Sequence, residues 1–222
     1  MTSPTNLLQR IERTLRFPAK IAAELVEYTD RIAGGVSNDF YLPLIQKLVQ
    51  TRQTQRNGAI VVFSSISSGE GVTYVVNKIA TELSRHCGES VMVATAGSLC
   101  GLEPAHFENV EPDTSSSPKV WRLARTCPES VLDGATHPES LQLLRQRFGY
   151  VLIDCPALKE SAAAFSMAGI VDGIVLVVAA GEAKRDQIEQ AQSALQSSTR
   201  NLLGLVLNKR TEPIPRLIAK FI

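Results

Sequence analysis

Residues 59–83 contain an apolar run, a loop of serines and glycines and a helical pattern, in the order that phosphate-binding loops use. The run 59–63 is typical of a buried strand, and after Thr73 the apolar residues recur at helical spacing. The backbone N–H groups of such a loop and the positive end of the following helix point at one place, where an anion can bind. We expect Glu70 to be exposed to solvent. The candidate nucleotide-binding residues of this loop are Ser68, Gly69, Glu70, Gly71, Val72 and Thr73.

Asp154 is a further candidate because it stands near the end of a second apolar run, 150–155, which is followed by Pro156. In open parallel sheets ligands bind at the carboxyl ends of the strands. The Asp154 carboxylate and the Thr73 hydroxyl are therefore the candidate Mg²⁺ ligands. Each has another possible role. The Asp154 carboxylate could cap the turn before Pro156, and the Thr73 hydroxyl could accept N–H groups of the loop.

The loop lacks the lysine that phosphate chemistry needs. A working P-loop ends in Gly-Lys-Ser/Thr, where the lysine reaches the β- and γ-phosphates and the hydroxyl holds Mg²⁺. Here Gly71 and Thr73 are in place, but Val72 occupies the lysine position. A charged hydrogen bond contributes roughly 1.5–3 kcal/mol, so its loss should weaken nucleotide binding by about ten- to a hundredfold. We expect no required cofactor, and at most weak binding of ATP or ADP with Mg²⁺.

The composition is that of a soluble globular protein with one α/β core. The chain has 222 residues, of which 44% are apolar and 20% charged, and a formal net charge of +1, which argues against binding nucleic acid through bulk charge. Its four cysteines show no metal-ligand spacing, which fits a reducing cytosol. No apolar run reaches the ~18 residues that span a bilayer. These features predict a cytoplasmic protein, in peripheral contact with the membrane at most.

The elements that position the loop alternate between strands and helices from residue 59 onward, which predicts a mostly parallel sheet between two layers of helices. We expect a long surface loop over 96–117 and a helix opened by Pro138. Before this region, three amphipathic helical patterns (about 5–17, 21–33 and 38–53) predict N-terminal helices. The expected organisation is an N-terminal helical segment (1–56), a P-loop NTPase-like α/β domain (57–212) and a short amphipathic tail (213–222).

Four segments resemble, in order and spacing, the cytoplasmic kinase domain of the bacterial tyrosine kinases of capsule and exopolysaccharide export, the CpsD/CapB kind. These are part of the P-loop ATPases that include the MinD and ParA proteins. The matching segments are 64–73, 148–156, 171–182 and 203–209. The resemblance implies a P-loop NTPase fold, a nucleotide site with Asn208 as a contact to the base, and a homo-oligomer. It also implies a partner, the cytoplasmic segment of a membrane polysaccharide co-polymerase, chain-length or export protein.

The departures from that family all affect the same chemistry. Val72 replaces the lysine, and Thr95 and Gly97 stand where the family's second strand carries aspartates. The run 39–45 retains one acid of the family's self-association motif and neither arginine. The family's tyrosine-rich tail has no counterpart, since tyrosines occur only at 28, 41, 74 and 150. We therefore predict no catalytic residues, and a regulatory or binding role in polysaccharide assembly.

Two alternatives remain open. One is an active tyrosine autokinase or ATPase that uses another lysine, with Lys78, Lys119, Lys159 and Lys209 as the candidates. We expect Lys78 to be a solvated surface residue, because it lies one to two turns into the helix. The other alternative is a nucleotide-dependent membrane switch of the MinD kind, anchored through the tail 213–222.

Overall fold

The computed structural model describes residues 41–99, 110–112, 119–123, 138–198 and 201–209. The chain divides into two units, Met1–Arg56 and Asn57–Ile222, each taken here by itself. The expected helices near 5–17 and 21–33 and the tail 213–222 lie outside the described residues.

The described part of the first unit is helix α3 (Leu42–Gln53). Pro43 stands in its first turn, where a proline is tolerated because the N–H group at that position has no acceptor within the helix. The helix ends at Gln53, and the hydroxyl of the following Thr54 donates to the carbonyl oxygen of Thr51 at 2.7 Å. The sequence pattern placed the start of this helix at 38, and the described helix starts at Leu42.

The second unit is built on a seven-stranded sheet in the order β3-β4-β2-β5-β1-β6-β7. Six strands run parallel, and β3 pairs antiparallel with β4 at one edge. Every residue of β1 and β6 is buried, as expected for central strands covered on both faces. This confirms the predicted α/β fold with a mostly parallel sheet. The strands are β1 (Ala59–Ser65), β2 (Val91–Thr95), β3 (Val110–Pro112), β4 (Val120–Leu123), β5 (Tyr150–Asp154), β6 (Gly173–Ala179) and β7 (Leu202–Asn208).

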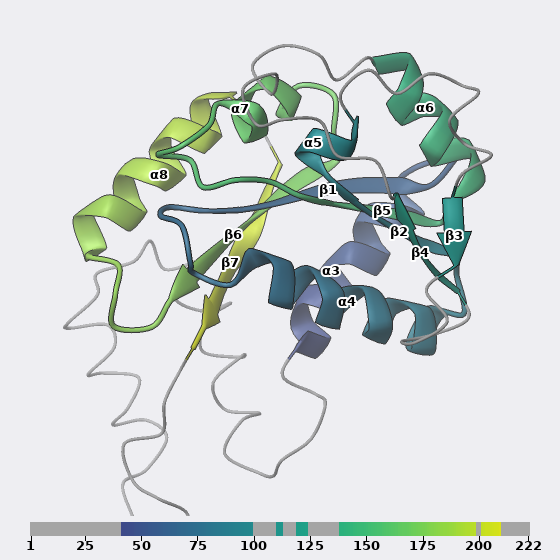
Figure 1. Cartoon of the computed structure of the whole chain (residues 1–222), viewed down its shortest axis with the longest axis horizontal. Helices are drawn as coiled ribbons and strands as arrows, with labels where there is room; N and C mark the ends of the chain where they lie inside the picture. The colour runs from purple at the N-terminus through teal and green to yellow at the C-terminus, as the bar shows by residue number, and fades with distance from the viewer. Residues whose placement is uncertain (1–40, 100–109, 113–118, 124–137, 199–200, 210–222) are drawn as a thin grey trace, which may run out of the picture. The chain divides into compact units, whose positions relative to one another are not determined.

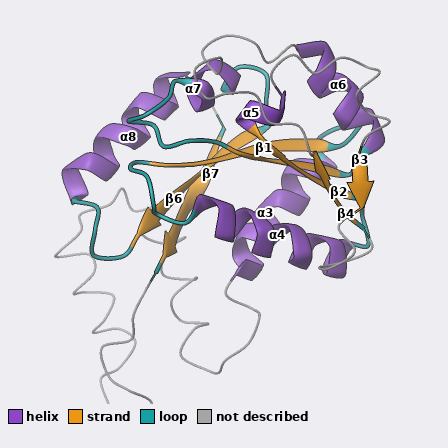
Figure 2. Ribbon diagram, in the orientation of Figure 1, coloured by secondary structure: helices purple, strands orange, loops and turns teal. Residues whose placement is uncertain are grey.

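Helices cover both faces of this sheet. Figure 1 shows α4 on one face and α6, α7 and α8 on the other, and Figure 2 shows the same layers by secondary structure. The connection from β1 through α4 to β2 runs in one direction along the sheet. The connections from β5 through α7 to β6 and from β6 through α8 to β7 run in the other direction. Because such crossovers are right-handed, α4 lies on one face of the sheet and α7 and α8 lie on the other. The bounds are α4 (Val72–Cys87), α5 (Ala96–Leu99), α6 (Pro138–Arg147), α7 (Ala163–Met167) and α8 (Arg185–Ser198).

The direction of the crossovers leaves room for a binding site at the carboxyl ends of the central strands. Because the connections after β1 and β5 leave towards opposite faces, a crevice opens between them. The register brings Phe63 of β1 and Thr95 of β2 level with Asp154 of β5, which lies between them. The expected chemistry at Asp154 and at the loop after β1 therefore falls at one edge of the sheet.

The predicted loop over 96–117 is partly structured, so that expectation was wrong at two places. Helix α5 follows β2 directly, because Thr95 and Ser98 exchange hydrogen bonds: each backbone N–H donates to the other's side-chain oxygen, at 2.9 and 3.0 Å. Such reciprocal capping begins a helix even in a short segment. The second place is β3, which pairs with β4.

Candidate functional site

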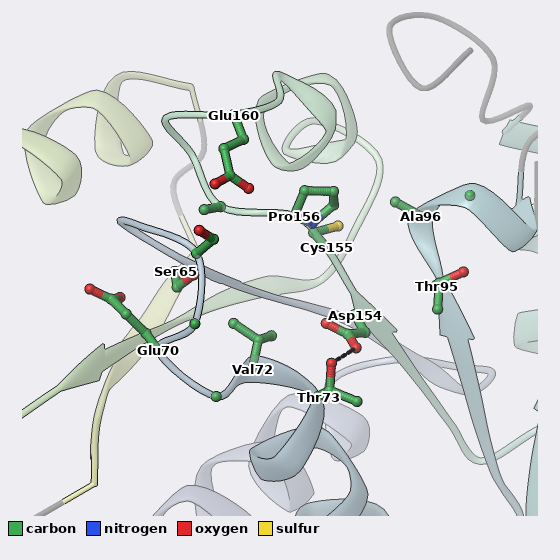
Figure 3. Close-up of a pocket in the computed structure, with 15 residues that line it drawn as sticks. Ser65, Glu70, Val72, Thr73, Thr95, Ala96, Asp154, Cys155, Pro156 and Glu160 are labelled. Carbon is green, nitrogen blue, oxygen red and sulfur yellow. Dashed lines mark hydrogen bonds between the residues drawn. The ribbon is translucent and has the colours of Figure 1, made fainter. Parts of the chain in front are cut away.

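A cavity of about 540 Å³ lies at the carboxyl ends of β1, β2 and β5. Its described walls come from the loop between β1 and α4, from the start of α5, and from the turn after β5 that includes Glu160. Figure 3 shows these walls around Val72, Thr73 and Asp154. The structure therefore gathers all the sequence-predicted loop residues and Asp154 at one cavity. Asn208 is not among its lining residues but contacts the backbone of the loop.

The loop owes its shape to two glycines in left-handed conformations, Gly69 (φ +80°) and Gly71 (φ +92°). Asn208, at the end of β7, donates from Nδ2 to the carbonyl oxygen of Glu70 at 2.8 Å. A Cβ atom on Gly71 would lie 2.2 Å from the same Nδ2. The described contact of Asn208 is thus with the backbone of the loop. Its predicted contact with a nucleotide base stays a prediction.

Gly71→Ala should distort the loop, because alanine disfavours the positive φ and its methyl group would displace the Asn208 amide. We expect a loss of roughly 1–3 kcal/mol of stability, the range for a strained backbone position, as measured by urea unfolding. Gly69→Ala is the matched control for the conformational part alone, because a Cβ on Gly69 would meet nothing within 4 Å. An equal loss in the two variants would show that the Asn208 contact is without effect.

Thr73 and Asp154 are joined directly: the Thr73 hydroxyl donates to Asp154 Oδ2 at 2.6 Å (Figure 3). Burial raises the pKa of the Asp154 carboxyl, and the hydrogen bond from Thr73 lowers it by less. The two candidate Mg²⁺ ligands are therefore side by side. Whether they hold a metal stays a prediction.

The raised pKa of Asp154 has a consequence for stability. A carboxyl whose pKa is higher in the folded than in the unfolded state binds its proton more tightly in the folded state. Its contribution to stability is therefore present below the ordinary pKa of 3.8, and it is lost as the pH rises through the pKa of the folded state. Asp154→Asn should therefore be more stable than the wild type at pH 7, with the difference shrinking as the pH falls towards 4. Thermal melts of both proteins between pH 4 and 8 measure this, and a variant that is less stable throughout would contradict it.

We expected Glu70 to be exposed, but the structure buries it. The residue is 2% exposed, and its Oε2 accepts the N–H of Ile66 at 3.1 Å. Burial raises the pKa of Glu70, while hydrogen bonds from the N–H groups of Ile66 and Ser67 lower it. The prediction failed because the tight turn leaves N–H groups of the loop in need of an acceptor, and the Glu70 side chain folds back to accept them.

Val72 lies in the wall of the cavity, with 8% of its surface exposed. Thr95 and Gly97, in the positions of the family's aspartates, line the same cavity.

Sequence reasoning missed Glu160, which lies in the connection after Asp154 and carries no motif signal of its own. Among the described lining residues the ionisable side chains besides the Cys155 thiol are the carboxyls of Glu70, Asp154 and Glu160, and lysine, arginine and histidine are absent.

The four lysines considered as replacements lie elsewhere, and none is among the described residues of the cavity wall. Lys78 is exposed, as predicted. Lys119 donates to the carbonyl oxygen of Gly88 at the far end of α4, and Lys209 pairs with Glu182 at 3.5 Å. Lys159 lies beside the loop, where its Nζ is 3.2 Å from Ser67 Oγ. Of the four, Lys159 is the one in contact with the loop.

The donor set lacks the lysine that a working P-loop presents to a magnesium–triphosphate complex. The loop offers N–H groups and the positive end of α4, but Val72 supplies no charge to the phosphates. The other ionisable side chains of the described wall, besides the Cys155 thiol, are carboxyls and add no positive charge. Within the described ranges, no group of three or more His, Cys, Asp and Glu side chains is arranged to hold a metal ion.

The fold and the position of this loop are those of a P-loop NTPase-like α/β protein. Solved structures share it. The chain superimposes on the BceF tyrosine kinase domain with a TM-score of 0.66 at 20% identity, covering 90% of this chain and 96% of that one. It superimposes on the MinD cell division protein of Aquifex aeolicus with a TM-score of 0.54 at 17% identity, covering 74% and 73%.

The sequence comparison is more specific. The chain is homologous to the tyrosine-protein kinase CpsD of Streptococcus agalactiae, with 32% identity over 87 residues. The matched segment is 39% of this chain and spans 38% of the length of CpsD. No protein-family model matches the chain. The resemblance to the CpsD kinases predicted from the sequence is thus confirmed as homology together with a shared fold.

None of the helices that the structure describes has both the length and the apolar character needed to cross a bilayer.

Proposed function

We propose that this chain is a non-catalytic relative of the CpsD tyrosine kinases, which regulates polysaccharide assembly by binding a partner. The observation that carries the proposal is the cavity wall, where Val72 stands in the lysine position and the described ionisable side chains besides Cys155 are carboxyls. Phosphoryl transfer depends on positioning and charge stabilisation. Removing one preorganised donor commonly costs about 10²–10³ in rate. With the cation and the acids of the second strand replaced, turnover should be negligible.

The partner we propose is the cytoplasmic segment of a membrane co-polymerase, chain-length or export protein of a capsule or similar exopolysaccharide. Support comes from homology to CpsD and from the preserved fold around a cavity whose described wall has no lysine. The protein would then be cytoplasmic, at the inner face of the membrane through this contact. Self-association into a homo-oligomer remains part of the proposal, as do the boundaries 1–56, 57–212 and 213–222.

Calorimetric titration of the full chain with ATP and Mg²⁺ tests the proposal. We expect no binding tighter than about 10–100 μM, because the lost lysine alone weakens a micromolar affinity by roughly ten- to a hundredfold. Micromolar binding would contradict the proposal. ADP, titrated in parallel, checks whether the γ-phosphate matters.

The contact of Lys159 with Ser67 of the loop favours a second candidate function, an active tyrosine autokinase or ATPase. If Lys159 replaced the missing cation, Lys159→Met would abolish ATP binding. Lys78→Met is the control, since Lys78 is exposed on α4 and its Nζ lies 5.7 Å from the centre of the Tyr74 ring.

A further inference from the structure

The cavity is acidic where a phosphate site is basic. Glu70, Asp154 and Glu160 belong to its described wall, without a lysine, arginine or histidine among the described lining residues. Figure 3 shows Asp154 at the end of β5 and Glu160 on a separate wall, on the turn that follows that strand. The Glu70 carboxylate is buried within the loop, where it accepts the N–H of Ile66 at 3.1 Å. A cation is the charge that complements this wall.

The carboxylates of the described wall do not by themselves form a metal site. Metal sites bring several oxygen or nitrogen ligands to within about 2–2.6 Å of one point, and the described residues contain no such group of three. The carboxylates stand apart, around a cavity of about 540 Å³. An extended organic cation fits separated carboxylates in a space of this size better than a point charge does.

The rest of the wall is apolar or offers hydrogen-bond donors. Val72, Ala96, Pro156 and Ala157 present aliphatic surface. Lysine and arginine side chains bury aliphatic stems against such surface while their charged ends seek carboxylates. The N–H groups at the start of α4 would meet the carbonyl oxygens of a peptide backbone, which they can bind as they would an anion.

We propose that the cavity takes a lysine or arginine side chain from an extended peptide segment of the partner, in the place where related proteins hold a nucleotide. The stem packs on Val72 and Pro156, the charged end pairs with Asp154 and Glu160, and the peptide backbone meets the loop. The inference rests on the proposed non-catalytic function and specifies the chemistry of its partner.

The test uses fluorescence anisotropy of the full chain with a fluorescein-labelled Gly-Arg-Gly-Arg-Gly peptide. The matched probe replaces both arginines with citrulline, which has nearly the same shape and no charge. We expect the arginine peptide to bind at least about tenfold more tightly than the citrulline peptide at low salt, and to be released as NaCl rises, because a partly exposed charge pair is screened.

Three variants locate the binding. Asp154→Asn and Glu160→Gln should each weaken the arginine peptide about fivefold, and Val72→Lys about tenfold, since it adds a like charge inside the cavity. Glu189→Gln is the control, because Glu189 is an exposed carboxylate of α8 paired with Arg185, away from the cavity wall. It should change the affinity by less than about twofold. Glu160 is exposed, so Glu160→Gln keeps the test valid if Asp154→Asn fails to fold.

Equal binding of the two peptides, or a weakening by Glu189→Gln as large as that by Glu160→Gln, would overturn the inference. The ATP titration separates this outcome from failure of the proposed function. A chain that binds neither ATP nor the arginine peptide loses the inference alone, whereas micromolar ATP binding removes both.

Discussion

Replacing Val72 with lysine should tighten ATP binding by about ten- to a hundredfold, because it returns a charge-assisted hydrogen bond worth roughly 1.5–3 kcal/mol. Val72 is 8% exposed in the cavity wall, so an ammonium group on this stem would enter the cavity. The carboxylates of Asp154 and Glu160 would hold it charged. Calorimetric titration of the variant with ATP and Mg²⁺ gives the affinity.

The control for this substitution is Val72→Met, which is also long and flexible but carries no charge. A gain with methionine equal to the gain with lysine would show that shape, and not charge, limits binding. No gain with lysine would mean that the loop cannot receive a phosphate for another reason. We expect the lysine variant to bind without turning over, because Thr95 and Gly97 still replace the acids of the second strand.

The largest effect on stability should come from Asp172→Ala. Asp172 accepts from Arg145 Nη1 through both carboxylate oxygens, at 2.9 and 2.7 Å, and from the N–H of Ile60 at 2.7 Å. The same arginine nitrogen donates to the carbonyl oxygen of Gly58 at 3.1 Å. The side chains of Arg145 and Asp172 are 11% and 8% exposed. Removing one partner leaves a buried charge without compensation, which costs about 3–5 kcal/mol.

Urea unfolding of Asp172→Ala measures this loss. The double variant Arg145→Met with Asp172→Asn separates charge burial from the hydrogen bond to Ile60, because it removes both charges and keeps an acceptor for that N–H. We expect the double variant to recover most of the lost stability. A single variant within about 1 kcal/mol of the wild type would contradict the assigned role, since surface pairs contribute only that much.

Much of the fold follows from local patterns. The apolar run at 59–63 predicts β1 because a strand buried on both faces needs no polar alternation, and the structure extends it to Ser65. The helix opened by Pro138 is α6, because proline suits a first helical turn. Gly69 and Gly71 mark the loop, since both adopt positive φ. These features depend on neighbours in the sequence, which is why periodicity and residue type predict them.

The rest depends on contacts between distant residues. Asn208 meets Glu70 across 138 positions, and no local pattern states that its amide supports the loop. Glu70 looks like a solvated side chain until the turn supplies buried N–H groups for it to accept. Glu160 joins the cavity only because the turn after β5 comes back to the loop, where the N–H of Leu158 donates to the carbonyl oxygen of Ser65 at 2.8 Å. The charge of the cavity could therefore not be predicted from the motif alone.

The most direct measurement is turnover by the full wild-type chain with radiolabelled ATP and Mg²⁺, followed by phosphate release and by label on tyrosine. We expect neither above the rate without protein, and no change with Asp154→Asn. Release of phosphate or labelling of tyrosine that Asp154→Asn abolishes would show that the cavity turns over nucleotide.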